Sequence, residues 1–325
     1  MPFPLLSLPI NIQQLVLEQM DHVDKISLSF CSKQTKTLVK KLNLQFKLSQ
    51  LLINELVTLA FNIGSKTESY HSMQRMFLDF TNLLTTTGTE VRIRVPVDNG
   101  YPQMWKIRNF GVRDWIDHIL DVFSASQIYE CRFWGEPTPF ETETLQNIVK
   151  GLNFECLVTD DPLSDDDFKK IMAVVPNPSR IRLLLNTVQL NDREFMRKVT
   201  LQNYQYFDLF DFWPAHFASL DNFLMINAST IQFFRSEFRV ADINRFMKLW
   251  TRGAMRTLKY LYLLGSPNII TNWNGVLDGI KRVEIPHNKY KRLGIRRRTD
   301  GAFATATFRL GVDHERPCFE FYVFK

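Results

Sequence analysis

The feature that most limits how this sequence can fold is a regular recurrence of short apolar runs through residues 129–262. Six runs are rich in β-forming residues, and apolar residues taken one from each run are 25, 27, 24, 24 and 27 positions apart. The runs are Tyr129–Phe133, Phe154–Val158, Ile181–Leu185, Tyr206–Phe210, Thr230–Phe234 and Leu258–Tyr262. Their composition predicts a strand at each place.

Helix-like patterns lie between these runs. Phe168, Ile171, Met172 and Val175 recur at i, i+3, i+4 and i+7, the spacing of one face of a helix. Related patterns occupy residues 145–152, 217–224 and 243–250. Ser164, followed by three aspartates, supplies a cap and negative charge at a helix start. Strands and helices therefore alternate, which indicates an α/β fold.

A strand and a helix about every 20 to 29 residues is typical of leucine-rich-repeat solenoids, whose strands stack into one parallel sheet. The consensus asparagine and strict leucines are missing, so we expect a degenerate, leucine-rich-repeat-like strand–helix array. A doubly wound α/β domain would also show alternating strands and helices. Its glycine-rich turn after the first strand is not present.

The C-terminal residues predict an antiparallel end to this array. Thr299-Asp300-Gly301 is a turn signal between the β-forming runs Leu293–Arg297 and Phe303–Leu310. Cys318–Phe324 alternates apolar residues on one side. We expect a three-stranded β cap that covers the open edge of the sheet.

Three short helices are expected within residues 3–44. Pro9 suits a first helical turn, and Ile12, Val16 and Met20 follow at four-residue intervals to form an apolar face. Asp24 and Ser32 are candidate starts of the second and third helices. A segment this short buries little hydrophobic core by itself. The three helices therefore need a partner or an attached domain.

These residues resemble the F-box family. The elements that carry the resemblance are Leu8-Pro9, Ile12, Val16, Met20, Asp24, Ile26, Leu28 and Cys31-Ser32-Lys33. Thr35 departs from the pattern, because many F-boxes have a bulky aromatic residue there. The resemblance implies docking on a Skp-type adaptor, and through it a cullin, by Leu8, Pro9, Ile12, Val16, Met20, Ile26, Leu28 and Lys33. The alternative is a helical hairpin folded against its own chain.

A second resemblance lies in residues 209–262. Leu224–Ser229, Val240–Trp250 and Arg256–Leu261 are similar to the F-box-associated domain, type 2, of nematode F-box proteins. The two resemblances imply a non-catalytic substrate-recognition subunit of an SCF-type (Skp–cullin–F-box) E3 ubiquitin ligase, which binds a protein target. The alternatives are a non-ligase interaction scaffold and a basic nucleic-acid-binding protein.

The expected domain organisation has three parts. Residues 1–45 form the F-box, residues 46–90 a helical linker that contains Ser49–Ala60 and Met73–Leu84, and residues 91–325 the leucine-rich-repeat-like F-box-associated domain with its C-terminal β cap. The fold class is thus α/β, with a three-helix N-terminal module.

Net charge gives little support to nucleic-acid binding. The chain carries +6, and residues 281–298 alone hold eight Lys or Arg and one Glu, so the rest is near neutral. Arg296–Arg298, with Lys289, Lys291 and Arg292, could be a nuclear-localisation or nucleic-acid patch. We favour alternate arginines pointing outward on an edge strand, because no array of base-stacking aromatics accompanies them.

Other candidate sites are weak. Cys31, Cys131, Cys156 and Cys318 are dispersed, as in a protein with reduced thiols. His22, His118, His216 and His314 have no nucleophile at motif spacing. Asp160-Asp161 and Asp165–Asp167 lack EF-hand spacing, so we expect no metal site there. We also expect no catalytic residue and no cofactor. The aromatic cluster Tyr204, Tyr206, Phe207, Phe210, Phe212 and Trp213 is expected mostly in the core rather than on a recognition surface.

Two observations bear on location. No apolar run reaches the ~18 residues that a membrane span needs, and the N-terminus has no basic segment typical of a signal peptide. We expect an intracellular protein of the cytoplasm, the nucleus or both, with no membrane partner.

Overall fold

The computed structural model describes residues 5–64, 74–81, 90–95, 103–107, 110–134, 141–160, 164–175, 177–184, 193–210, 220–236, 238–265, 274–286, 291–309 and 317–324. The chain divides into two compact units. Unit 1 comprises Met1–Trp134 and Thr138–Glu155, and unit 2 comprises Gly135–Pro137 and Cys156–Lys325.

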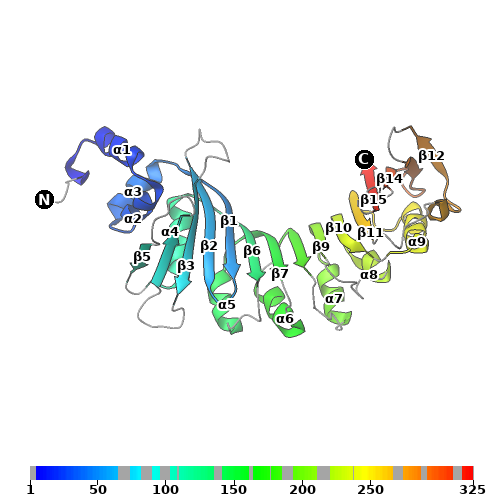
Figure 1. The fold of residues 1–325 in the computed structure, drawn as a ribbon, viewed down its shortest axis with the longest axis horizontal. Coiled ribbons are helices and arrows are strands. Elements are labelled where there is room, and N and C mark those ends of the chain that lie inside the picture. Colours follow the sequence, from blue (N-terminus) through cyan, green and yellow to red (C-terminus); the bar gives the residue numbers. More distant parts are fainter. Residues whose placement is uncertain are drawn as a thin grey trace. The chain divides into compact units, whose positions relative to one another are not determined.

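Unit 1 begins with a short 3₁₀ turn and three helices (Figure 1). These elements are η1 (Leu5–Ser7), α1 (Ile10–Gln19), α2 (His22–Ser29) and α3 (Lys33–Lys41). The three predicted helices are confirmed, and Pro9 occupies the N-cap of α1 as expected.

The caps of α2 and α3 explain where these helices begin. The Asp21 carboxylate accepts from the Asp24 N–H at 2.7 Å, so Asp21 rather than the predicted Asp24 caps α2. Ser32 caps α3 as predicted: the Thr35 N–H donates to Ser32 Oγ at 3.1 Å, and the Ser32 N–H donates to Thr35 Oγ1 at 3.0 Å. This reciprocal pair is a capping box. It gives a structural role to the threonine that departs from the F-box pattern.

The rest of unit 1 is a sheet with two helices. Its strand order is β6-β1-β2-β3-β4-β5, antiparallel except for the parallel pair β1–β6. The elements are β1 (Gln45–Ile53), β2 (Val57–Gly64), β3 (Gln74–Thr81), β4 (Glu90–Arg94), β5 (Gln103–Lys106), α4 (Val112–Val122), β6 (Ile128–Trp134) and α5 (Thr142–Val149).

The predicted helical linker over residues 46–90 is wrong, because its described residues form strands. Ser49–Ala60 lies in β1, a turn and β2, and the described part of Met73–Leu84 is β3. Both faces of β2 are buried, so the segment lacks the period-2 alternation of a half-buried strand. An uninterrupted apolar run can be mistaken for a buried helix. The predicted boundary at residue 91 fails with it, since the sheet already starts at Gln45.

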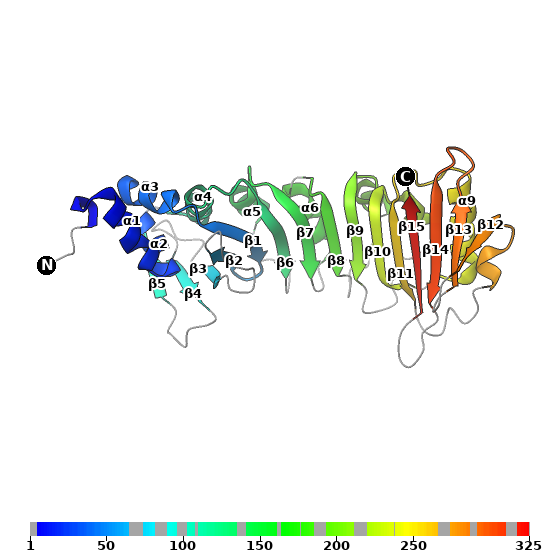
Figure 2. The same ribbon diagram turned by 90° about the horizontal axis from the view of Figure 1, so that it is seen from above.

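Unit 2 contains the regular alternation that the sequence predicts. Its parallel strands pair in the order β7-β8-β9-β10-β11, and the intervening helices lie on one face of them (Figure 2). The elements are β7 (Phe154–Asp160), α6 (Asp165–Val174), β8 (Arg180–Leu184), α7 (Arg193–Thr200), β9 (Tyr204–Phe210), α8 (Leu220–Met225), β10 (Ala228–Ser236), α9 (Val240–Thr251) and β11 (Tyr260–Gly265).

The register of these strands places the buried residues in rows. Ile181 is opposite Phe207, Phe207 is opposite Ile231, and Ile231 is opposite Leu261. All four are fully buried and form the helix-covered face of the sheet. Leu258, which the spacing assigns to the last strand, lies before β11 and is also buried. The relation of this array to leucine-rich repeats stays a prediction.

The C-terminal strands extend the sheet of unit 2. The predicted hairpin and last strand are β13 (Lys291–Arg296), β14 (Phe303–Arg309) and β15 (Cys318–Phe324). They are antiparallel, and β15 pairs with β11, which confirms the predicted cap. One more strand, β12 (Arg282–Ile285), pairs with β13. The strand with the arginine cluster is therefore internal, and the prediction that it lies at the edge is wrong.

Within the described residues, no helix is long and apolar enough to cross a membrane. That part of the chain also has no group of three or more His, Cys, Asp and Glu side chains placed to hold a metal ion. Cys131, Cys156 and Cys318 are buried free thiols, whereas Cys31 is exposed.

Candidate functional site

The 3₁₀ turn η1 and the helix α1 present an unusual amount of aliphatic surface. Leu6 of η1 is 41% exposed, and Ile10, Ile12 and Leu15 of α1 are 58%, 38% and 54% exposed, whereas Leu17 of α1 is 1% exposed. We call the exposed set Leu6, Ile10, Ile12 and Leu15 the aliphatic ridge. An isolated exposed leucine is ordinary, but several on one short segment indicate an interaction surface.

A buried glutamine fixes the start of the ridge. Gln13 is 6% exposed, and its side-chain amide donates to the carbonyls of Leu6 and Leu8 at 3.3 and 2.7 Å. These bonds tie η1 and the Leu8-Pro9 pair to α1. The segment before the helix is thereby held in one conformation and not left to fray.

The eight predicted adaptor-contact residues fall into three groups. Pro9, Ile12 and Lys33 are exposed, and Leu8, Val16, Met20 and Leu28 are half-buried. Ile26 is 0% exposed, because it lies on the face of α2 that packs inward. The structure therefore contradicts the assignment of Ile26 to the contact surface.

Leu6, Ile10 and Leu15 are ridge residues that the sequence reasoning missed. The i, i+4 pattern of Ile12, Val16 and Met20 drew attention to one stripe of α1. The signal that could have found the others is the excess of aliphatic residues in α1, where Gln13 and Leu17 are the buried positions. More apolar residues are present than one buried stripe requires.

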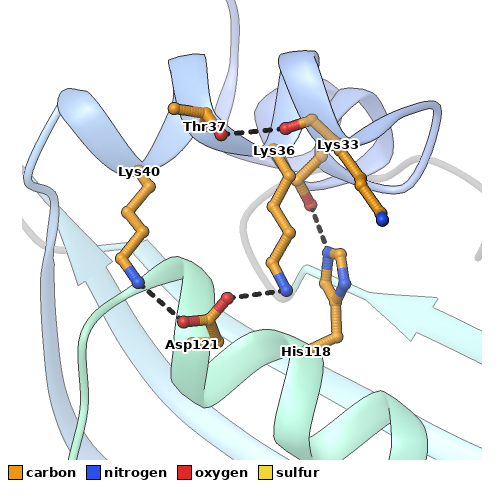
Figure 3. Close-up of polar contacts among 7 residues, drawn as sticks. Lys33, Lys36, Thr37, Lys40, His118 and Asp121 are labelled. Carbon is orange, nitrogen blue, oxygen red and sulfur yellow. Dashed lines mark hydrogen bonds and ion pairs between the residues drawn. The ribbon is translucent and has the colours of Figure 1, made fainter.

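Polar and charged contacts attach α2 and α3 to α4 (Figure 3). Asp121 of α4 forms ion pairs with Lys36 and Lys40 of α3 at 2.7 and 2.6 Å. Hydrogen bonds from the two lysines lower the pKa of Asp121 to about 2. Lys33 lies on the same helix, but its ammonium points away from this cluster (Figure 3).

His118 of α4 makes a second attachment. Its Nε2 lies 2.8 Å from Ser29 Oγ, and its ring stacks on Phe30 with centroids 3.8 Å apart. The Ser29 hydroxyl donates to the Ile26 carbonyl, so the Nε2–H of His118 is the donor to Ser29. Burial, assisted by the Lys36 charge, lowers the pKa of His118 to about 4. The ring is neutral near pH 7.

Phe30 continues into an aromatic cluster. Its ring lies 4.5 Å from that of Trp115 in α4, and 6.1 and 6.3 Å from those of Phe110 and Trp105. Such contacts stabilise packing beyond the apolar area that they bury. The three N-terminal helices are thus anchored within unit 1 through α2 and α3, and α1 keeps its ridge exposed.

Comparison with known families bears directly on these helices. Residues 5–47 match the model of the F-box domain, and residues 195–263 match that of the F-box associated family. The chain therefore contains an F-box domain and an F-box-associated domain. No curated protein and no solved structure matches it.

The two matches correspond to defined parts of the fold. The F-box match spans η1 and α1–α3, and the F-box-associated match runs from α7 almost to the end of β11. The domains indicate an F-box protein of SCF-type ubiquitin ligase complexes. F-box domains generally bind Skp-type adaptors, and F-box proteins are generally non-catalytic.

The F-box-associated region contributes to a pocket of about 840 Å³ in unit 2, a size common for ligand sites. It lies where β9, β10 and β11 begin, beside the β13–β14 turn. Asn203, Asn227 and Thr257 line it from the strand starts, and Arg296, Arg297 and Asp300 line it from the turn. We call it the strand-start pocket. The sequence reasoning noted the arginines and the turn, but not that the fold brings them to the strand starts.

The sheet face opposite the helices in unit 2 is rich in tyrosine and arginine. Tyr206, Tyr260 and Tyr262 are half-buried there, and Tyr322 is 48% exposed. The Arg180 guanidinium lies 4.2 Å from the Tyr206 ring centroid. Tyrosine and arginine are enriched where proteins bind one another, so this face is a second candidate surface.

The remaining sequence candidates are divided between core and undescribed residues. Tyr204 and Phe207 are buried, as predicted for the aromatic cluster, whereas Phe212, Trp213, His216, His314 and Asp161 lie outside the described residues. The Asp167 N–H donates to Ser164 Oγ at 3.1 Å, so Ser164 caps α6 as the sequence predicts, and Ser164 Oγ donates to the Asp167 carboxylate at 2.6 Å. His22 lies at the start of α2.

Proposed function

We propose that this protein is a substrate-recognition subunit of an SCF-type ubiquitin ligase. Its F-box helices dock on a Skp-type adaptor, and unit 2 binds the target protein. The observation that carries the proposal is the aliphatic ridge, which stays exposed although α2 and α3 are anchored to α4. Helices that present aliphatic anchors bind in apolar grooves of partner proteins.

The proposed contact set follows from exposure. It combines the predicted residues Leu8, Pro9, Ile12, Val16, Met20, Leu28 and Lys33 with the ridge residues Leu6, Ile10 and Leu15. Most of it is aliphatic, so desolvation of apolar area is the main favourable term in docking. Lys33 adds a cation at the start of α3.

The protein would perform no bond chemistry in this role. By holding a target on the same assembly as the charged ubiquitin-conjugating enzyme, it raises the effective concentration of a target lysine near the reactive thioester. This role needs two binding surfaces on one chain. The ridge in unit 1 and the candidate surfaces in unit 2 meet that need.

The test is co-purification of the full chain with a Skp-type adaptor. Ile12→Asp places a charge on the ridge at a position 38% exposed, so we expect loss of adaptor binding while the protein stays folded. Leu56→Asp is the matched control, because Leu56 is 41% exposed in the turn between β1 and β2. If the folded wild-type chain binds no adaptor, or if both variants bind as wild type, the ligase role is rejected.

A further inference from the structure

We propose that the strand-start pocket binds an anionic side chain, phosphorylated or carboxylate, that lies next to apolar residues in a peptide of the target. This inference rests on the proposed function, in which unit 2 receives the target. It adds to that function the chemical class of segment that is recognised and the place where it binds.

The first argument is the excess of cations that line the pocket. Arg256, Lys259, Arg296 and Arg297 line it together with a single carboxylate, Asp300. Arg256, Lys259 and Arg296 are exposed. Such a concave cationic surface attracts anions more strongly than scattered surface charges do.

The second argument is that the one carboxylate already has a partner. Arg297 Nε donates to Asp300 Oδ1 and Arg297 Nη2 to Asp300 Oδ2, each at 2.9 Å. This two-bond geometry is typical of a strong arginine–carboxylate pair. The hydrogen bond from Arg297 is also the main reason that the pKa of Asp300 is lowered. Asp300 therefore stays ionised and satisfied by Arg297, and the charges of Arg256, Lys259 and Arg296 are left for a ligand.

Two of these cations are not used by the fold. The side chains of Arg256 and Lys259 form no hydrogen bond or ion pair with any residue that the structure describes, and Arg256 acts on Asp300 only through its charge at longer range. Arg296 makes a single long contact with the Gly301 carbonyl at 3.4 Å, and its guanidinium lies 5.5 Å from the Phe303 ring centroid. Charged side chains without a structural partner are available to bind an anion at little cost in folding energy.

The third argument is that the turn forming one wall is held rigidly. Arg297 is 5% exposed, and its guanidinium lies 5.0 Å from the ring centroid of Trp250 in α9. The Arg297 N–H donates to the Ala302 carbonyl and the Arg298 N–H to the Thr251 carbonyl, both at 2.8 Å. A wall fixed before binding loses less entropy when the ligand arrives.

The remaining lining explains why we expect apolar neighbours beside the anion. Leu258, Val323, Phe303 and Phe324 contribute apolar surface to the same pocket, and Phe324 is 44% exposed. At the strand starts, Asn227 donates to Asn203 Oδ1 at 2.5 Å and accepts from the Thr257 hydroxyl at 3.0 Å. A peptide that pairs an acidic group with an apolar residue matches both parts. A nucleic-acid strand needs a longer basic track.

The test measures binding of fluorescent peptide pools to the full chain. Three pools of short peptides share leucine-containing flanks and differ only at the central residue, which is phosphoserine, aspartate or serine. We expect the phosphoserine or aspartate pool to bind about tenfold more tightly than the serine pool. Preference for phosphoserine would assign phosphate as the natural group, and equal binding of both anionic pools would assign carboxylates.

Variants locate the binding. Arg256→Gln with Lys259→Gln should remove the preference for anionic pools, whereas Lys281→Gln, which removes an exposed charge that does not line the pocket, should leave it intact. Equal binding of all three pools, an unchanged preference in the double variant, or tighter binding of a single-stranded RNA oligonucleotide would overturn the proposal.

The same samples separate this proposal from the ligase role. Adaptor co-purification depends on the ridge of unit 1, and the double variant leaves that ridge unchanged. If the chain binds the adaptor but no anionic pool, the pocket proposal alone fails. If anionic pools bind but the adaptor does not, the ligase role fails and the pocket assignment stands.

Discussion

The aliphatic ridge of unit 1 and the strand-start pocket of unit 2 present different chemistry to a binding partner. The ridge consists of leucine and isoleucine side chains 38–58% exposed, without a charged residue among them. The pocket is concave and lined by four cationic residues. Binding at the ridge depends on apolar area, whereas binding in the pocket depends on charge and on a fixed shape.

The difference also appears in how each surface is supported. Three of the four ridge residues lie on α1, whose buried face holds only Gln13 and Leu17, so much of the apolar surface of this helix is left for a partner. The pocket wall is locked by the Arg297–Asp300 pair and by contacts with α9. A helix that binds in a groove needs exposed apolar side chains as anchors. A pocket that selects a charged group needs charged side chains that are held in place before binding.

The largest expected effect is on stability, and it distinguishes the buried leucine of α1 from an exposed one. Leu17→Ala removes a side chain 1% exposed and should lower the free energy of unfolding by about 2 to 5 kcal/mol. Leu15→Ala, at 54% exposure, should change stability by less than about 0.5 kcal/mol. Thermal melts followed by circular dichroism measure both.

Adaptor affinity should show the reverse dependence on Leu15. We expect Leu15→Ala to weaken adaptor binding about tenfold although the fold is unchanged, since anchor residues carry much of the affinity of an interface. A stable Leu15→Ala protein with wild-type adaptor affinity would place Leu15 outside the docking surface and narrow the ridge to its remaining residues.

The sequence predicted the strands of unit 2 better than those of unit 1. In unit 2 the strands β7–β10 are short and each is followed by a helix, so the change from strand to helix periodicity distinguishes the elements. In unit 1, β2 is buried throughout and offers no alternation. The residues that pair β1 with β6 are about 80 positions apart, and such long-range pairing leaves no local signal in the sequence.

The sites were predictable to the extent that they are local. Leu8, Pro9, Ile12 and Ser32 lie close together in the chain, so a short motif finds them. The attachment of α3 to α4 joins Lys36 and Lys40 to Asp121, which is more than 80 residues further on. The strand-start pocket likewise joins the start of β9 to a turn near residue 300. Only folding brings such residues together.

An intermediate effect follows from pH, and it distinguishes the two units. The pKa of His118 is about 4 in the folded protein against an ordinary value of 6.5, chiefly because of burial. Between pH 6.5 and 4 the unfolded chain therefore binds a proton that the folded chain does not, so stability falls as the pH falls. Lys36 and Asp121 are the charged groups that act on His118, and Asp121 stays ionised in this range.

Hydrogen exchange resolved by segment measures this effect. We expect amides of α2–α4 to lose protection on acidification from pH 6.5 to 4, while the described part of unit 2, which contains no histidine, keeps more of its protection. His118→Gln removes the titrating group and should flatten the dependence of unit 1. A wild-type pH profile in that variant would show that another group is responsible.

The smallest expected effect is the response of the two surfaces to salt. Raising the ionic strength from 0.1 to 1 M shortens the screening length from about 10 to about 3 Å, which weakens attraction by Arg256, Lys259 and Arg296 but leaves burial of aliphatic side chains unaffected. Affinity for the anionic peptide pools should therefore fall by about three- to tenfold, whereas adaptor affinity should stay level or rise slightly.

Fluorescence anisotropy for the peptides and calorimetry for the adaptor give the two values on one preparation. Equal losses at both surfaces would mean that the adaptor is bound through the charge of Lys33 more than through the aliphatic ridge. Ile12→Asp would then weaken the adaptor complex no more than Lys33→Gln does.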